Sequence, residues 1–310
     1  MRGISHSRKS AREGSWYYKM SEPVHKRRWN AETTDVAFAE PFTSAQAPED
    51  LRNPVNIPPL LRGAVQSPHS VALRHFFGQL EPEPGWMPPD VDVLFLCFTN
   101  RCGSNYLAHL LATTGVFNEA GEYFNAPTVV QHAVPLGLRS LPAYFSALPT
   151  LVPNPGRIAA KAGVDQLMML ADVGILDALR GRATYLMIER EDRLGQAISR
   201  VIAAQNLRWS TGHVSEVPDS ALVFDHAWIK RELAEIAVMN AAFAQFFLAN
   251  DIVPIRTTYE ALLRNPSPAV EALAATMHLR NLRARPENVA IRRQANAVND
   301  AWRRTYLRNT

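Results

Sequence analysis

Short apolar runs recur through the middle of the chain and alternate with longer amphipathic stretches. The first run, residues 91–98, is β-rich and bounded by polar residues, which is typical of a buried central strand. Further strands are expected at 157–162, 183–188 and 252–257. Strands that alternate with helices predict an α/β fold with a central, mainly parallel sheet flanked by helices. Ligands should then bind at the carboxyl ends of the strands.

Helical periodicity fills most of the intervals between these strands. The expected helices are 71–79, 106–113, 164–179, 193–205, 224–250, 268–279 and 299–307. Gly115 follows the second of them and is suited to a left-handed cap. Loops are expected at 117–156 and 206–223, around the strand ends.

The two ends of the region before the first strand differ in character. Residues 1–50 lack sustained periodicity and predict a flexible basic N-terminal arm. Residues 51–90 contain eight prolines and form an irregular approach to the core. A chain of 310 residues is long enough for one large domain with a tail. We therefore expect the arm to precede a single domain over 51–310.

Positive charge is concentrated at the two ends of the chain. The net charge is +4, but residues 1–30 hold eight Lys or Arg against two acidic residues. Residues 280–310 hold eight Arg, again against two acidic residues, so the segment between these ends is acidic. A nucleic-acid partner would require a basic face on the folded body, and we expect none. A basic C-terminal segment is better suited to a local phosphate site.

The two cysteines, Cys97 and Cys102, cannot form a disulfide framework, which favours a reducing, cytoplasmic location. No apolar run approaches the ~20 residues of a membrane span, so no stable membrane insertion is expected. The basic arm is compatible with peripheral contact with an anionic membrane. An organelle-targeting role for the arm and a homodimeric assembly are left open.

The segment after the first strand has the composition of an anion-binding loop. It reads Arg101-Cys102-Gly103-Ser104-Asn105 and leads into a helix, whose free N–H groups and dipole favour an anion. Gly103 would let the backbone approach closely, and Arg101 adds fixed charge. An NTP-binding P-loop would need an earlier glycine and a Gly-Lys-Ser/Thr end, which are missing. A plain strand-to-helix connection is the alternative.

A second cluster follows the strand at 183–188. Arg190 stands at the end of that strand, and Ser199 lies nine residues later in the next helix. An arginine at a strand end and a serine one to two helical turns further on can close on one phosphate. The alternative is a surface arginine and a serine that bonds back to its own helix.

Together these motifs resemble the PAPS-dependent sulfotransferases, where PAPS is 3′-phosphoadenosine 5′-phosphosulfate. The likeness is greatest to the bacterial branch that includes trehalose 2-sulfotransferase and lipopolysaccharide-sulfotransferase-like proteins. The matching segments are 101–105, 114–116, 118–124, 160–161, 190–199, 205–209, 259–266 and 294–306, in the order of the family. The resemblance covers roughly 91–307. Departures are Cys102 for Ser, Asn105 for Thr, and Glu191 for Pro.

The resemblance implies a P-loop-like three-layer α/β fold and in-line transfer of a sulfuryl group from PAPS to a hydroxyl of a carbohydrate or glycolipid. It implies PAPS as cofactor, PAP as product, and no metal. The loop 101–105 would bind the 5′-phosphosulfate, with Arg101 also assisting catalysis. Arg190, Ser199 and Arg293 would bind the 3′-phosphate.

The resemblance also assigns acceptor-side roles. Glu122 matches the proposed catalytic carboxylate of the family. Glu119 is either the alternative candidate for this carboxylate or a substrate-binding residue. Lys161 would act on the sulfonate or bridging oxygen, and Gln205 and Trp209 would line the sugar. A solvated loop glutamate and a strand-end lysine are the structural alternatives.

Cys102 is expected to be reactive. It lies at a candidate helix N-terminus beside Arg101, and both features lower a thiol pKa. Because Cys102 and Asn105 both depart from the loop of the family, a catalytically inactive PAP-binding module is an alternative function. The remaining alternative is a P-loop-like kinase or nucleotide hydrolase.

Overall fold

The computed structural model describes residues 68–154, 156–209, 217–291 and 296–309. The expected arm, the start of the domain at residue 51, and Arg293 lie outside these ranges. The elements are α2 (Pro68–Phe77), β1 (Asp92–Phe98), α3 (Ser104–Ala112), α4 (Ala126–Leu136), α5 (Leu141–Leu151), β2 (Arg157–Ala162), α6 (Val164–Asp172), α7 (Ile175–Ala178), β3 (Ala183–Glu189), α8 (Arg193–Asn206), α9 (His226–Ala249), β4 (Ile255–Thr258), α10 (Tyr259–Arg264), α11 (Ser267–Thr276) and α12 (Ala297–Arg308).

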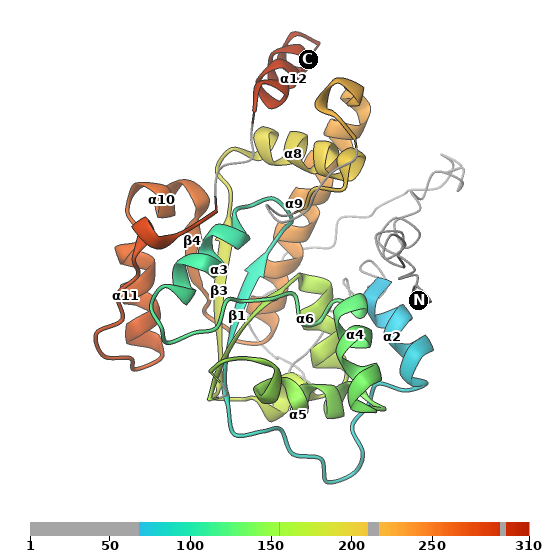
Figure 1. The fold of residues 1–310 in the computed structure, drawn as a ribbon, viewed down its shortest axis with the longest axis vertical. Coiled ribbons are helices and arrows are strands. Elements are labelled where there is room, and N and C mark those ends of the chain that lie inside the picture. Colours follow the sequence, from blue (N-terminus) through green and yellow to red (C-terminus); the bar gives the residue numbers. More distant parts are fainter. Residues whose placement is uncertain (1–67, 155, 210–216, 292–295, 310) are drawn as a thin grey trace, which may run out of the picture. The chain divides into compact units, whose positions relative to one another are not determined.

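The four strands form one parallel sheet in the order β2-β1-β3-β4 (Figure 1). β1 is central, and Phe95 in its middle pairs with Ala160 of β2 and Tyr185 of β3. The prediction of an α/β fold with a mainly parallel sheet is therefore confirmed. Because all the strands are parallel, their carboxyl ends meet at one edge, where ligands bind in such sheets.

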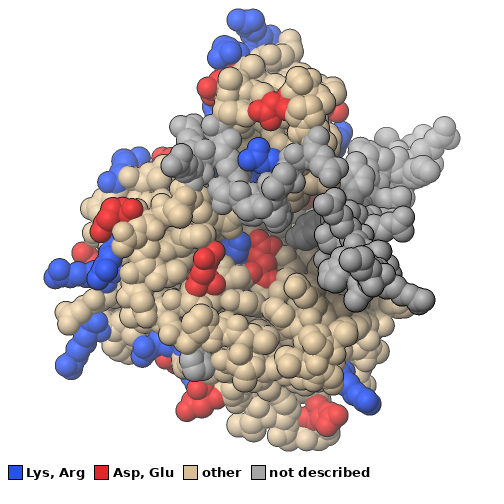
Figure 2. Space-filling model, viewed as in Figure 1, with Lys and Arg blue, Asp and Glu red and all other residues tan. Residues whose placement is uncertain are grey.

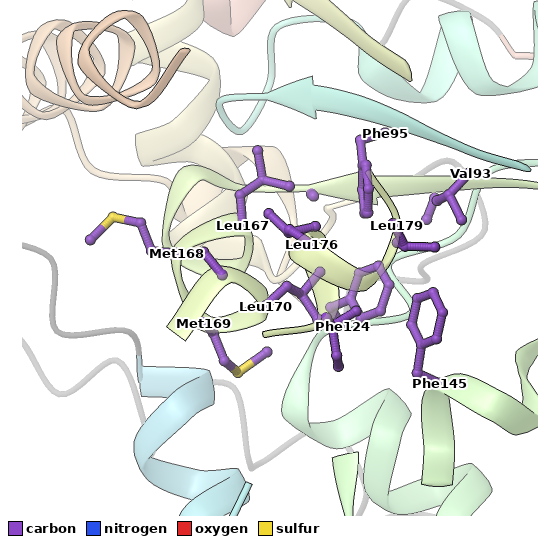
Figure 3. Close-up of a cluster of buried hydrophobic side chains, with 14 of the residues drawn as sticks. Val93, Phe95, Phe124, Phe145, Leu167, Met168, Met169, Leu170, Leu176 and Leu179 are labelled. Atoms are coloured by element: carbon purple, nitrogen blue, oxygen red, sulfur yellow. The ribbon is translucent and has the colours of Figure 1, made fainter. Parts of the chain in front are cut away.

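Helices cover both faces of the sheet, giving three layers. Alternate side chains of β1 enter two separate apolar clusters, as the period of a strand requires. The first set is Val93, Phe95 and Cys97, and the second is Leu94, Leu96 and Phe98. The first cluster includes side chains of α2, α4, α5, α6, α7 and α9, and the second includes those of α3, α10 and α11. Figure 3 shows Phe95 packed above the leucines of α6 and α7.

Three expectations about elements are wrong. The single helix expected at 164–179 is two helices, because Gly174 adopts a left-handed φ of 75° between them. β4 begins at Ile255 and not at 252, since Pro254 has no N–H for the ladder. The stretch 117–156, expected as loops, contains α4 and α5. Each has a proline in its first turn, which is tolerated because N–H groups there have no helical partner.

The long helix α9 lies within the helix expected at 224–250, but its relation to a membrane differs from the expectation. By length and composition alone it could cross a membrane, which the sequence reasoning had excluded for every segment. Core helices of soluble proteins can have the same length and composition, so these two properties are weak evidence for a membrane span. In the structure Phe243, Phe246 and Phe247 of this helix are buried in the first apolar cluster.

Candidate functional site

The loop after β1 is held in a left-handed conformation at two positions. Arg101 has a φ of 68° and Gly103 a φ of 97°. A side chain at Gly103 would also collide with the ring of Tyr259, so only glycine suits this position. Gln196 of α8 fixes the loop, because its Nε2 donates to Thr99 Oγ1 at 2.8 Å and to the carbonyl of Asn100 at 3.0 Å.

The loop ends at the start of α3. Its N-cap residue is Gly103, and no side chain caps the helix there. Ser104 is the first helical residue and is buried. The first N–H groups of a helix carry partial positive charge and lack helical partners, so this end of α3 is suited to binding an anion.

Cys102 does not have the properties expected of it. Its side chain is fully buried, and burial raises the pKa of the thiol to about 11. Hydrogen bonds from nearby backbone N–H groups and the charge of Lys161 lower this pKa but do not outweigh the burial. The prediction of a lowered pKa and a reactive thiol is therefore wrong.

Arginines gather where the loop meets α8. Arg101 Nε donates to Ser199 Oγ at 2.9 Å, and its Nη1 donates to the carbonyl of Trp209 at 2.8 Å. Arg190 Nη1 donates to the carbonyl of Arg101 at 3.4 Å. Burial and, to a smaller extent, the charges of Arg190 and Arg208 together lower the pKa of Arg101 to about 10. A bound anion would relieve this crowding of positive charge.

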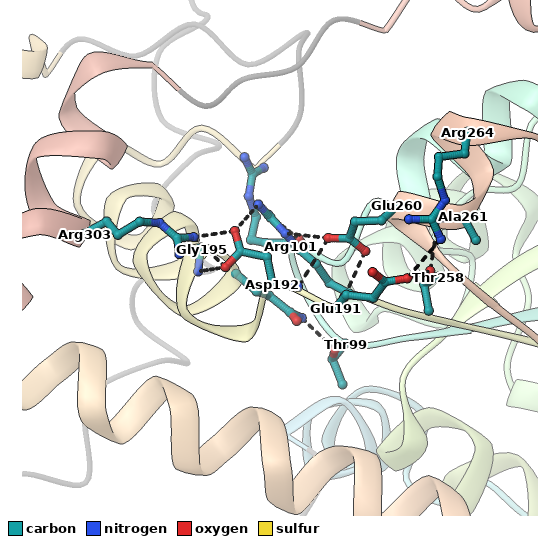
Figure 4. A network of polar contacts seen from close by, with 12 residues as sticks. Thr99, Arg101, Glu191, Asp192, Gly195, Thr258, Glu260, Ala261, Arg264 and Arg303 are labelled. Carbon is teal, nitrogen blue, oxygen red and sulfur yellow. Dashed lines mark hydrogen bonds and ion pairs between the residues drawn. The ribbon is translucent and has the colours of Figure 1, made fainter. Parts of the chain in front are cut away.

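Two carboxylates, those of Asp192 and Glu260, hold Arg190 in position, and Figure 4 labels both of them. Its Nη2 lies 3.5 Å from Asp192, its Nε lies 3.9 Å from Glu260, and its guanidinium stands 5.8 Å from the centre of the Tyr259 ring. Asp192 is shared with Arg303 of α12. The Nε of Arg190 is nonetheless buried without a hydrogen-bond acceptor among the described residues. It is a donor that a ligand could satisfy.

A pocket opens beside this cluster, between α8 and the start of α12. Arg101, Ser199, Asn206, Arg208, Asn296 and Asn299 line it, together with three other residues. On the face drawn in Figure 2, basic and acidic side chains are interspersed. The arginines that line the pocket are Arg101 and Arg208.

A second group of polar side chains lies along the free edge of β2. The side chain of Asn118 imitates a strand, since it donates to the carbonyl of Ala159 at 2.9 Å and accepts from its N–H at 2.8 Å. The chain then forms a parallel bridge between Gly121 and Ala160, and the N–H of Lys161 donates to Gly121 at 2.8 Å. This pairing brings the next residue, Glu122, beside Lys161.

Lys161 links this edge to the anion-binding loop. Its Nζ lies 3.0 Å from Glu122 Oε1 and donates to Asn105 Oδ1 at 2.6 Å. The other carboxylate oxygen of Glu122 accepts from Asn125 Nδ2 at 2.5 Å. Asn125 in turn accepts a hydrogen bond from Gln166. A buried cation and a fixed carboxylate thus stand together, an arrangement that can stabilise developing negative charge and accept a proton.

Several expected acceptor-side residues have other partners. A carboxylate oxygen of Glu119 lies 2.9 Å from Nε2 of His109, and the side chain of Glu119 is 59% exposed. Gln205 exchanges two hydrogen bonds of 2.8 Å with the backbone of Val223. Trp209 meets Arg101 through its carbonyl. Their roles toward an acceptor stay predictions.

The fold brings together most of the expected anion-binding and catalytic residues. These are Arg101, Gly103, Ser104, Asn105, Glu122, Lys161, Arg190 and Ser199. Sequence reasoning missed Asn125 and Gln166, which no motif marked, and Arg208, which lies between the matched Gln205 and Trp209. Gln196 stood inside a matched motif, which was a usable signal for its role. Within the described residues, no group of three or more His, Cys, Asp or Glu side chains is placed to bind a metal ion.

Comparison with known proteins gives one family. Residues 161–309 match the family model of the Stf0 sulphotransferases. No curated protein matches the chain. The matched segment begins at Lys161 and contains Arg190 and Ser199, whereas the loop after β1 and Glu122 precede it.

Proposed function

The chain belongs to the Stf0 sulphotransferase family by its segment 161–309, and on that premise we propose that it transfers a sulfuryl group from PAPS to a hydroxyl of a carbohydrate or glycolipid. The observation that carries the proposal is the cluster of Arg101, Arg190 and Ser199 beside the uncapped start of α3. A cytoplasmic location, with peripheral membrane contact, and a homodimer are kept as proposals.

The residues present fit a nucleotide with two separate anionic groups. Arg190 and Ser199 are assigned to the 3′-phosphate, and Arg293 remains a predicted further contact. Arg101 was expected at the 5′-phosphosulfate, but its hydrogen bond to Ser199 favours the 3′-phosphate for it as well. The buried donor on Arg190 and the mutual repulsion of the arginines both call for an anion here. The backbone N–H groups at the start of α3 and the side chain of Ser104 are assigned to the 5′-phosphosulfate.

When bound, PAPS supplies an activated sulfuryl group on a phosphate leaving group. The ammonium of Lys161 stabilises the negative charge that develops on the oxygen between sulfur and phosphorus. Glu122 takes the proton of the acceptor hydroxyl while the new oxygen–sulfur bond forms and the old one breaks. Asn125 fixes the carboxylate of Glu122 through its second oxygen, which leaves the carboxylate little freedom to turn away.

An inactive PAP-binding module is the second candidate. Asn105 stands in place of the threonine of the family and accepts a hydrogen bond from Lys161 at 2.6 Å. Lys161 would have to leave or share this bond to reach a leaving oxygen. A kinase or nucleotide hydrolase has no comparable observation in its favour.

Radiolabelled PAPS, incubated with the purified protein and a panel of glycosides and glycolipids, tests the proposal. A labelled sulfated product in the presence of wild type, and at least ~10²-fold less of it with Glu122→Gln, is expected. PAP binding without transfer to any acceptor would favour the inactive module. The absence of both PAP binding and sulfuryl transfer would refute the proposed function.

A further inference from the structure

The first turn of α2 places an imidazole beside the proposed catalytic carboxylate. α2 packs against α4 and α6 (Figure 1), and Leu73 on its inner face is fully buried. Arg74 ties it to α6 through an ion pair of 2.9 Å with Asp172. His69, the second residue of this helix, therefore has a fixed place next to the start of α4.

The hydrogen bond of His69 determines where its proton lies. The N–H of Ala126 donates to His69 Nδ1 at 3.2 Å, so in the neutral ring the proton is on Nε2. Burial lowers the pKa of His69, and the nearby carboxylates of Asp165 and Glu122 oppose this shift without reversing it. The ring is therefore neutral at pH 7 and presents a single donor at Nε2.

This donor is not used within the described part of the chain. The only hydrogen bond of the His69 side chain there is the one accepted from Ala126. The residue is half-buried, so the ring is neither sealed in the core nor fully solvated. Its hydrogen-bond partner Ala126 follows Asn125, whose side chain donates to Glu122, so His69 lies close to the proposed base.

We propose that His69 is an acceptor-binding residue whose Nε2–H donates to an oxygen near the reacting hydroxyl. The inference rests on the proposed function, because it assigns the surroundings of Glu122 to the acceptor. Asp165 and Glu122 both place negative charge next to His69, which disfavours an anionic acceptor. The chemistry that fits is a neutral, polyhydroxylated molecule, in which a second oxygen lies close to the reacting one.

His69 lies outside the segment that the family model matches. α2 ends at Phe77, well before the family-matched segment that begins at Lys161. In the sequence, His69 is also separate from the proposed donor-binding residues, which are the loop 101–105, Arg190 and Ser199. A substitution at His69 should accordingly change acceptor affinity and leave nucleotide binding alone.

Two variants separate binding from a purely structural role. In His69→Asn the amide oxygen can replace Nδ1 as acceptor for Ala126, but the distal donor is lost. In His69→Gln the amide nitrogen can replace Nε2 as donor, but the bond to Ala126 is lost. His75→Gln is the matched control, since His75 is exposed at the other end of the same helix.

The probe is methyl α-D-glucopyranoside, titrated into the PAP complex of each protein. In the wild type, NMR should show the imidazole resonance of His69 moving saturably with the sugar. His69→Asn should weaken sugar binding by about 2- to 10-fold, the effect of one neutral hydrogen bond. His69→Gln should weaken it less than His69→Asn, and His75→Gln should not change it.

An unmoved His69 resonance at 0.5 M sugar would overturn the inference, as would a larger loss in His69→Gln than in His69→Asn. The latter order is that of a residue that only supports the start of α4. The PAP-induced rise in melting temperature, measured on the same samples, tells this failure apart from failure of the proposed function. If PAP stabilises the wild type and the sugar does not act on His69, only the acceptor assignment falls.

Discussion

Replacing Lys161 by methionine should separate catalysis from stability. Lys161→Met keeps an unbranched side chain of similar length and removes the ammonium of a residue that is only 7% exposed. The change deletes the hydrogen bond to Asn105 and the ion pair with Glu122. Bonds to a charged group are worth about 1.5–3 kcal/mol each. Removing a buried charge also removes its desolvation cost of several kcal/mol, which acts in the opposite direction.

The two terms therefore nearly cancel in the folding free energy. Glu122 does not become a buried unpaired charge, because its side chain is 33% exposed and keeps the bond from Asn125. We expect a change in stability of about 2 kcal/mol or less, which is several degrees in Tm for a domain of this size. The transition state has no such compensation. Loss of one charge-stabilising donor costs roughly 2.7–4 kcal/mol, or about 10²–10³-fold in rate.

Thermal melting and single-turnover transfer from labelled PAPS, on the best acceptor of the panel, measure the two effects in one set of proteins. Lys230→Met is the matched control, because Lys230 is exposed on α9. Turnover by Lys161→Met within about threefold of wild type would refute the role of Lys161. A collapse in Tm would refute the cancellation on which the predicted stability rests.

Three further predictions concern Glu122, Cys102 and the ion pair between Asp192 and Arg303. Glu122→Gln should lower kcat by about 10²–10⁴-fold with little change in PAPS affinity, measured by steady-state kinetics, and near-full turnover would mean that the base lies elsewhere. Cys102 should resist iodoacetamide at neutral pH with or without PAP, since its thiol pKa is about 11, and rapid labelling that PAP blocks would contradict its burial. Burial raises the pKa of Asp192, but the hydrogen bonds and charge of Arg303, with other contacts, bring it below its usual 3.8. The ion pair therefore stabilises the fold above that pH and is lost as the pH falls through the lowered pKa, so the Tm difference between wild type and Arg303→Met should shrink on acidification. A difference that grows below pH 4 would have the wrong sign.

The sheet and the arginine cluster were predictable because they depend on short-range patterns and one topological rule. Apolar runs marked the strands, and β2 was placed at residues 157–162, as observed. Once the strands are parallel, Arg101 and Arg190 follow strands that end at the same edge. Their proximity therefore follows from the order of elements without any knowledge of packing.

The contacts around Glu122 were less predictable because they depend on the irregular edge of β2. The pairing with Lys161 needs the strand-like side chain of Asn118 and the single bridge at Gly121, neither of which has a periodic signature. The error at Cys102 has a related cause. The helix N-terminus and Arg101 were visible in the sequence, but the burial that dominates the thiol pKa was not.

The proposed function requires a site that recognises a 3′-phosphate through Arg190 and Ser199. Thermal shifts with PAP and with AMP, which lacks that phosphate, test this recognition. A ligand at about 100 times its dissociation constant stabilises by about 2.7 kcal/mol. PAP should raise the Tm of the wild type well above the shift given by AMP, and Arg190→Met should abolish the difference while Arg231→Met, an exposed control on α9, keeps it. Equal stabilisation of the wild type by PAP and AMP would contradict recognition of the 3′-phosphate by Arg190 and Ser199.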